Sequence, residues 1–156
     1  MALTNVTTYL WFDGRAQEAV EFYVNLFPES QRGSVSYYPD DAPHLPGQVL
    51  VAEFQIFGRP FAILNGGPGF PHSEAVSFQI ACDTQEDVDR LWEALISDGG
   101  EASRCGWCKD RFGISWQVIP RALGELLGDP DPEISGYAMN QMMQMSKIVI
   151  DDLRRS

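Results

Sequence analysis

Three cysteines are the residues whose type and spacing first suggest chemistry. Cys105 and Cys108 form a C-x-x-C pair, and Cys82 is the third cysteine. A redox pair of this form has its first thiolate at a helix N-terminus, whereas the residues after Cys108 have the composition of a turn with no helix to follow. A zinc site would need two more ligands. We therefore expect structural cysteines, with a reversible Cys105–Cys108 disulfide and a metal site as open alternatives.

No other side chains form a catalytic arrangement that the sequence can support. Glu53 and Asp110 each stand alone rather than in a pair of carboxylates, and no serine, histidine and aspartate can be placed together. The glycine-rich stretch 65–69 is followed by Phe-Pro-His, not by a helix, so it lacks the form of an S-adenosylmethionine loop. We interpret it as a turn, with a phosphate or cofactor cradle as the alternative, and we expect no cofactor.

The composition is that of one folded domain, residues 1–156, with an acidic surface. Eleven Lys and Arg stand against 22 Asp and Glu, which gives a net charge of -11 and a pI near 4.4. Such a charge repels phosphate backbones and anionic lipid headgroups, so we expect neither nucleic acid nor a membrane as a partner. The chain starts without a basic leader and has no apolar run of membrane-spanning length, and its cysteines are sparse. These features predict a cytoplasmic protein.

The hydrophobic pattern predicts the same order of elements twice, followed by a helical tail. In the first module, residues 4–68, Asp13 could cap the helix, and the elements are a strand over 6–12, a helix over 16–27 and strands over 33–38, 48–57 and 60–64. In the second module, residues 74–120, Thr84 caps the helix, and short strands are expected over 76–82, 101–105 and 114–119. The tail, residues 121–156, contains a Met-rich segment that we expect to pack on the body or on a second subunit.

Two constant shifts of the sequence indicate an internal duplication. A shift of 70 residues aligns Phe12 with Cys82, and in the helices it aligns Phe22 with Trp92 and Leu26 with Ile96. A shift of 55 residues aligns the turn dipeptide at 57–58 with that at 112–113. Equivalent positions agree in type and order, which favours an α+β fold of two tandem βαβββ modules.

Several stretches resemble a known superfamily, the vicinal oxygen chelate proteins, which include glyoxalase I, extradiol dioxygenases and antibiotic-resistance proteins. The motifs are those of its PhnB-like, demethylubiquinone methyltransferase-like branch, and the likeness runs from about Thr4 to Leu153; they lie at residues 9–14, 18–23, 64–68 and 105–117. The resemblance implies that the two modules form a curved mixed sheet with a concave pocket. It also implies a homodimer, with the Met-rich tail near the interface. Its pattern has an apolar residue after Cys-Gly-Trp, so Cys108 is expected in a packing position and Trp107 at the pocket rim.

Members of the superfamily that use a metal bind it through His, Gln or Glu on the first and last strand of each module. Strand alternation and the two shifts place Thr7, Ala62, Ser77 and Gln117 at these positions. Only Gln117 could ligate, and one neutral amide cannot hold a divalent ion. The two histidines, at positions 44 and 72, lie beside prolines in expected loops. We therefore expect no metal at this site.

The pocket that remains is expected to be aromatic with a few amides, which suits a flat or apolar small molecule oriented by hydrogen bonds. The expected ligand-binding residues are Tyr9, Trp11, Leu64, Asn65, Ser77, Gln79, Trp107 and Gln117. That these side chains only fill a core is the competing interpretation. The sequence thus favours a small-molecule-binding protein of the PhnB-like branch. The alternative is an enzyme that acts on a small aromatic or quinone-like substrate, and the sequence does not decide whether the protein is an enzyme.

Overall fold

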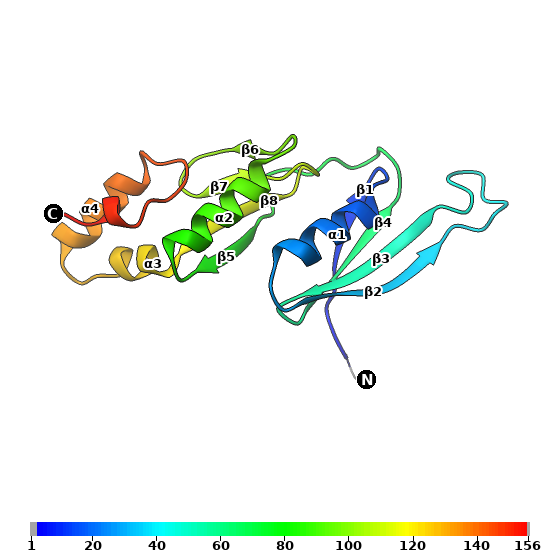
Figure 1. Ribbon diagram of the computed structural model, residues 1–156, viewed down its shortest axis with the longest axis horizontal. Helices are drawn as coiled ribbons and strands as arrows, with labels where there is room; N and C mark the ends of the chain where they lie inside the picture. Colours follow the sequence, from blue (N-terminus) through cyan, green and yellow to red (C-terminus); the bar gives the residue numbers. More distant parts are fainter. Residues whose placement is uncertain (1–2, 156) are drawn as a thin grey trace. The chain divides into compact units, whose positions relative to one another are not determined.

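The computed structural model describes residues 3–155, which form two compact units that divide between Pro71 and His72. Unit 1 is the part before this division and unit 2 the part after it. Each unit contains one four-stranded sheet, and Figure 1 shows a long helix lying along each sheet. None of the helices within residues 3–155 has both the length and the apolar character that crossing a membrane requires.

Unit 1 is the first βαβββ module. Its elements are β1 (Thr8–Phe12), α1 (Ala16–Leu26), β2 (Ser30–Tyr37), β3 (Val49–Ile56) and β4 (Arg59–Asn65). The strand order is β1-β4-β3-β2, in which β1 pairs with β4 in parallel and the other neighbours are antiparallel. The sheet is therefore mixed, as the resemblance implied.

Unit 2 repeats this topology and adds the tail. Its sheet elements are β5 (Phe78–Cys82), α2 (Gln85–Ile96), β6 (Glu101–Ala102), β7 (Trp107–Lys109) and β8 (Ser115–Pro120). The order β5-β8-β7-β6 matches the order of unit 1 strand for strand. The duplication and the α+β class are confirmed. The second module differs from expectation after α2. The strand predicted over 101–105 ends at Ala102, and a further strand, β7, begins at Trp107 after a turn.

The core of each unit lies between the helix and one face of its sheet. In unit 1, Tyr23 of α1 stacks on Phe54 with ring centroids 5.7 Å apart, and Phe54 stacks on Phe61 at 5.2 Å. Leu10 and Phe12 are buried on this face. Tyr9 points to the opposite face of the sheet and is 58% exposed. Each fully buried aromatic side chain contributes about 1.5–3 kcal/mol. The alternation along β1 therefore fixes which face meets the helix.

The connections between the first strand and the helix differ in the two units, and this corrects one predicted cap. Thr84 caps α2 as predicted, because its hydroxyl accepts a hydrogen bond of 3.1 Å from the backbone N–H of Asp87. Asp13 does not cap α1. The N-cap is Arg15, in the left-handed region with φ 65°, and no side chain caps the helix. Three residues separate β1 from α1, but only two separate β5 from α2.

This one-residue difference shifts the helix alignment from 70 to 69. Gln85 of α2 is thus equivalent to Ala16 of α1, since 85 minus 16 is 69. Trp92 then aligns with the fully buried Tyr23 rather than with Phe22, which is only half-buried. The predicted pairing of Phe22 with Trp92 was therefore wrong by one residue, as was that of Leu26 with Ile96, since Leu26 aligns with the buried Leu95.

The hairpin before the last strand is also one residue longer in unit 2. Phe54 pairs with Phe61, seven positions on, whereas Cys108 pairs with Trp116, eight positions on. The shift of 55 holds after the turn, where Phe61 aligns with Trp116. Before the turn the shift is 54, so Cys108 occupies the buried position that Phe54 occupies in unit 1.

The tail folds onto unit 2 as helices, as predicted. It contains α3 (Arg121–Leu127), α4 (Pro132–Met142) and the short 3-10 helix η1 (Asp151–Leu153). Leu123, Ile148 and Leu153 form its buried cluster, against which Met142 and Met145 pack. The Met-rich segment therefore contributes two of its side chains to the core of its own unit.

The tail is also hydrogen-bonded to the Cys-Gly-Trp-Cys stretch. The carbonyls of Met145 and Ser146 accept hydrogen bonds from the backbone N–H groups of Cys105, at 2.9 Å, and Gly106, at 2.8 Å. On the other side of the segment, Lys147 forms an ion pair of 2.6 Å with Asp89 of α2. The tail thus joins the turn before β7 to the helix.

Candidate functional site

The face of each sheet that lies opposite its helix is called here the open face. In unit 1 the open face carries Tyr9 and Trp11 from β1, which pair with Ala62 and Leu64 of β4 in the parallel register. Tyr9, Trp11 and Leu64 are therefore brought together, as predicted from strand alternation. The result is a surface of two aromatic rings and an aliphatic side chain.

Trp11 is held in place by the glycine-rich stretch. Its indole N–H donates a 2.7 Å hydrogen bond to the carbonyl of Gly67, and the ring of Phe70 meets its ring edge-on with centroids 4.9 Å apart. A Cβ atom at Gly66 would lie 2.3 Å from the indole, so this position needs a glycine. The stretch is therefore a turn that positions an aromatic side chain. Its backbone packs against the Trp11 indole at Gly66 and accepts the indole hydrogen bond at Gly67.

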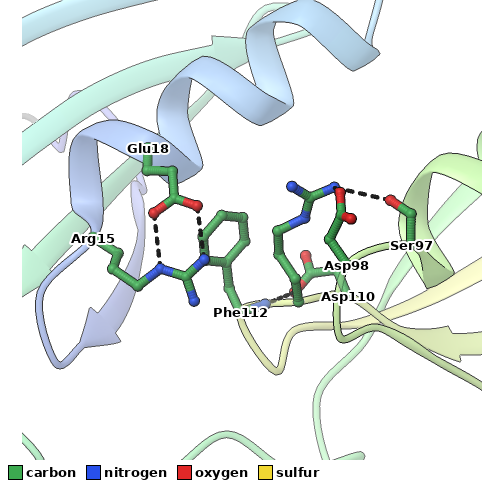
Figure 2. A network of polar contacts seen from close by, with 7 residues as sticks. Arg15, Glu18, Ser97, Asp98, Asp110 and Phe112 are labelled. Carbon is green, nitrogen blue, oxygen red and sulfur yellow. Dashed lines mark hydrogen bonds and ion pairs between the residues drawn. The ribbon is translucent and has the colours of Figure 1, made fainter.

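The structure places Asn65 on the opposite face from Trp11. Its side-chain amide donates to the carbonyl of Val49 at 3.0 Å, and its backbone carbonyl accepts a 2.7 Å hydrogen bond from the Tyr38 hydroxyl. Asn65 also lines a hollow of about 380 Å³ at the start of α1. There Arg15 forms a two-pronged ion pair with Glu18, shown in Figure 2. Asn65 is thus separated by the sheet from the other predicted residues of unit 1.

In unit 2 the open face carries the four remaining predicted residues. Gln79 of β5, Gln117 of β8 and Trp107 of β7 lie in one row across three neighbouring strands. The amide of Gln117 donates a 2.8 Å hydrogen bond to the hydroxyl of Ser77. The structure therefore brings Ser77, Gln79, Trp107 and Gln117 together, as two amides, a hydroxyl and an indole on one surface.

The residues at the metal positions of the superfamily do not fit a metal. Ser77 and Gln117 are bonded to each other, Ala62 is fully buried, and the Thr7 hydroxyl donates to the side chain of Asn5. Among residues 3–155, no group of three or more His, Cys, Asp or Glu is placed to hold an ion. The histidines at 44 and 72 lie in loops, as predicted. This donor chemistry offers one neutral amide, too weak a set for a divalent ion.

A small polar cavity beside Trp107 was missed by the sequence analysis. It has a volume of about 100 Å³ and is lined by Glu74, Glu101, Ala102, Ser103, Trp107, Cys108, Lys109 and Ser115. The register brings Glu101, Lys109 and Ser115 into one row across β6, β7 and β8. No sequence signal could find this row, because it depends on strands of two and three residues.

Two residues that line this cavity, Glu74 and Lys109, form an ion pair. The Lys109 ammonium lies 2.9 Å from the Glu74 carboxylate. The hydrogen bond from Lys109 lowers the pKa of Glu74, and the same bond raises the pKa of Lys109. Both groups are therefore charged at neutral pH, and each neutralises the other.

Asp110 stabilises the turn between β7 and β8. It is 2% exposed, and its carboxylate accepts hydrogen bonds from the backbone N–H groups of Phe112 (Figure 2) and Ile114, at 2.9 and 3.0 Å. Its other oxygen accepts a 2.8 Å hydrogen bond from the indole of Trp116. The buried carboxylate thus links the backbone of the β7–β8 hairpin to the buried Trp116 side chain in the core of unit 2.

The three cysteines are free thiols, and two are buried. Burial raises the pKa of Cys108 to about 12 and that of Cys82 to about 11, so neither forms a thiolate at neutral pH. Cys108 faces the core, which confirms its predicted packing position. Cys105 is half-buried, and its sulfur lies 4.0 Å from that of Met143.

The sequence matches one family model and several solved structures. The family described as 3-demethylubiquinone-9 3-methyltransferase matches residues 4–119. This match ends before α3, so it does not include the tail, to which the predicted likeness extended as far as Leu153. A search of curated proteins finds no match.

Among solved structures, a PhnB protein from Bacillus cereus, named for the same methyltransferase, is 30% identical. That match covers 75% of this chain and 99% of the other, with a TM-score of 0.69. A protein from Pseudomonas aeruginosa is 21% identical over 76% of this chain and 98% of its own, with a TM-score of 0.57. The fosfomycin resistance protein FosX from Listeria monocytogenes is 16% identical over 83% of this chain and 100% of its own, with a TM-score of 0.58. At these identities, the Pseudomonas aeruginosa and Listeria monocytogenes proteins show only that this chain has the same fold.

Proposed function

Because this chain belongs to the PhnB-like family described as 3-demethylubiquinone-9 3-methyltransferase, within the vicinal oxygen chelate superfamily, we propose that it binds a small molecule without the superfamily's metal. The observation that carries the proposal is the open face of unit 2. There Ser77, Gln79, Trp107 and Gln117 combine an indole surface with hydrogen-bonding groups. Such a surface suits a flat, partly polar molecule.

The open face of unit 1 supports the same proposal. Tyr9 is 58% exposed, and Trp11 is fixed by its bond to Gly67 and by Phe70. A fixed aromatic ring binds a ligand at a low cost in conformational entropy. We propose Tyr9, Trp11 and Leu64 as ligand contacts in unit 1.

A screen by thermal unfolding tests the proposal. Small aromatic and quinone-like compounds are added to the full chain, and a ligand at about 100 times its Kd should stabilise it by roughly 2.7 kcal/mol. Gln117→Ala should lose most of this stabilisation, whereas Gln144→Ala, at an exposed position just after α4, should keep it. If no compound stabilises the protein, or if Gln117→Ala responds as fully as the control, the proposed site is wrong.

Methyl transfer is the second candidate function, because the family and the Bacillus cereus relative carry that name. The residues present do not fit S-adenosylmethionine, since the glycine-rich stretch is committed to Trp11 and no helix follows it. We therefore place binding ahead of catalysis. Incubating each stabilising compound with the protein, with and without S-adenosylmethionine, and measuring product by mass spectrometry separates the two. Stabilisation without any product rejects the enzyme.

We also propose that the protein is a homodimer. The resemblance to the superfamily suggests it, and two methionines of the tail remain available for an interface, since Met139 is 44% and Met143 59% exposed. Light scattering gives the mass in solution. A mass of one chain would reject the dimer, and a dimer that persists in Met139→Lys and Met143→Lys would move the interface away from the tail.

A cytoplasmic location is proposed on the basis of the thiols. All three cysteines are free, which is the usual state in a reducing compartment. Fractionation of the source cells tests the location, and recovery of the protein outside the cytoplasm would reject it.

A further inference from the structure

We propose that the cavity beside Trp107 binds a protonated amine, so that the ligand of the open face of unit 2 is an aromatic or apolar amine. This inference rests on the proposed function, because the cavity adjoins the row that contains Trp107 and Gln117. It specifies the charge of the ligand, which the proposed function leaves open.

The charges around the cavity favour a cation. Two carboxylates, Glu74 and Glu101, face one ammonium, Lys109. Lys109 forms an ion pair with Glu74 at 2.9 Å. The Glu101 side chain is opposite Lys109 in the β6–β7 ladder and interacts with its charge at longer range, but it makes no side-chain hydrogen bond or ion pair with any of residues 3–155. With two carboxylates and one ammonium, the lining has a net charge of -1, and the whole chain has a net charge of -11. A ligand with one positive charge would neutralise the lining, whereas a carboxylate would meet repulsion.

Ser115 supplies the second, independent observation. It is 2% exposed, and its hydroxyl has no hydrogen-bond partner among residues 3–155, although it lines the cavity. Buried hydroxyl groups almost always have a hydrogen-bond partner, so a missing partner indicates that a ligand supplies it. A protonated amine has three N–H donors, which could reach both the Ser115 oxygen and the Glu101 carboxylate.

Trp107 provides the aromatic surface next to these acceptors. It is half-buried and lines the cavity between the strand of Glu101 and that of Ser115. An ammonium group is attracted to the face of an indole, and the same surface contacts the apolar part of a ligand. The volume of about 100 Å³ admits an amine head and one or two carbons, so the rest of the ligand must extend onto the open face.

Three compounds of one shape test the sign of the charge. Isothermal titration of the full chain with 2-phenylethylamine, 2-phenylethanol and phenylacetate compares a cation, a neutral alcohol and an anion. The amine should bind at least about tenfold more tightly than the alcohol, and phenylacetate should bind most weakly. Raised salt should weaken binding of the amine more than that of the alcohol.

Two variants and a matched control locate the effect. Glu101→Gln should reduce affinity for the amine about tenfold and leave affinity for the alcohol unchanged, whereas Glu125→Gln, the same change on α3, should leave both unchanged. Ser115→Ala should weaken the amine about threefold or more without lowering the unfolding temperature of the free protein, because it removes a hydroxyl that has no partner.

The outcomes separate this inference from the proposed function. If the alcohol or phenylacetate binds as well as the amine, or if Glu101→Gln binds the amine like the control, the amine site is wrong while small-molecule binding stands. If none of the three binds but other compounds in the thermal screen stabilise the protein through Gln117, the amine site is again rejected alone. If no compound of any charge binds, both fall together.

Discussion

In unit 1 the open face is aromatic, with Tyr9 and Trp11 in its first strand, whereas the first strand of unit 2 presents Gln79 at the same place. On the helix side the two units agree much more closely. Phe61 and Trp116 are both buried there, as are Phe12 and Cys82. The two modules have thus kept the pattern that packs a helix on a sheet, while the opposite face has diverged.

The two units also differ in how their ends are held. Unit 2 has an additional tail against the turn before β7, a capped helix and a buried carboxylate in its hairpin. Unit 1 has none of these three among its described residues. Its hairpin instead uses the turn residues Phe57 and Gly58, both at positive φ. The comparison teaches that the shorter strands of unit 2 depend on polar and tertiary contacts that the longer strands of unit 1 do not need.

The largest expected effect tests how closely the turn before β7 packs against β8 and the tail. Gly106→Ala should destabilise the protein by about 4 kcal/mol, because at a φ of +82° the new Cβ would lie 2.8 Å from Ile119 and 2.9 Å from the carbonyl of Val118 in β8, and 3.2 Å from Ile148 of the tail. Denaturant unfolding measures the loss. Gly58→Ala and Gly113→Ala also have positive φ but open space, so each should cost only about 1 kcal/mol. Equal losses in all three variants would mean that the close packing of Gly106 against β8 and the tail adds nothing to the cost of the positive φ.

The second test concerns the hairpins. Asp110 takes the place that Ile56 has in unit 1, by the shift of 54. Asp110→Ala and Asp110→Leu should each cost about 3 kcal/mol, because both leave the Trp116 indole and two backbone N–H groups without an acceptor. Urea unfolding followed by Trp fluorescence measures this. A stable Asp110→Leu variant would show that the position only needs bulk, as in unit 1.

The third test compares the helix starts. Thr84→Ala should cost about 1 kcal/mol, since it removes the acceptor for the Asp87 N–H. Asp13→Ala should change stability by less than about 0.5 kcal/mol, because Asp13 caps nothing. Thermal unfolding of both variants measures the two losses of stability. A loss from Asp13→Ala equal to that from Thr84→Ala would restore the predicted cap on α1.

The effect that is smallest at neutral pH is a dependence on alkaline pH, which belongs to unit 2 because all three cysteines lie there. Burial raises the folded-state pKa of Cys82 to about 11 and that of Cys108 to about 12, from an ordinary value of 9.0. The unfolded chain therefore releases these protons first, so stability is complete below pH 9 and falls as pH rises toward 12.

Comparison with a cysteine-free core isolates this slope. The double variant Cys82→Ala and Cys108→Ala should lose stability less steeply than the unaltered protein between pH 9 and pH 11, although it starts lower because of the two small cavities. Unfolding curves at several pH values give the two slopes. Parallel slopes would show that the thiols do not resist ionisation.

Most of the fold could be predicted from the sequence, because it depends on patterns within single elements. The alternation in β1 and β8 placed Tyr9, Trp11 and Gln117 on the open face, and the cap at Thr84 was visible from its neighbour Asp87. The predictions failed by one residue where a connection changes length. A left-handed residue such as Arg15, or a hairpin with one more residue, leaves no periodic signal.

The sequence by itself determined the duplicated βαβββ order, the acidic charge and the family, since these depend on residue type and local spacing, and the resemblance to the family implied the packing position of Cys108. The tertiary structure decided which polar groups meet. It placed Asn65 behind the sheet, committed Gly66 and Gly67 to Trp11, and assembled Glu101, Lys109 and Ser115 beside Trp107. The physical reason is that hydrogen-bond partners and cavities depend on strand register across β6, β7 and β8, and two or three residues are too few for a sequence pattern to specify a register.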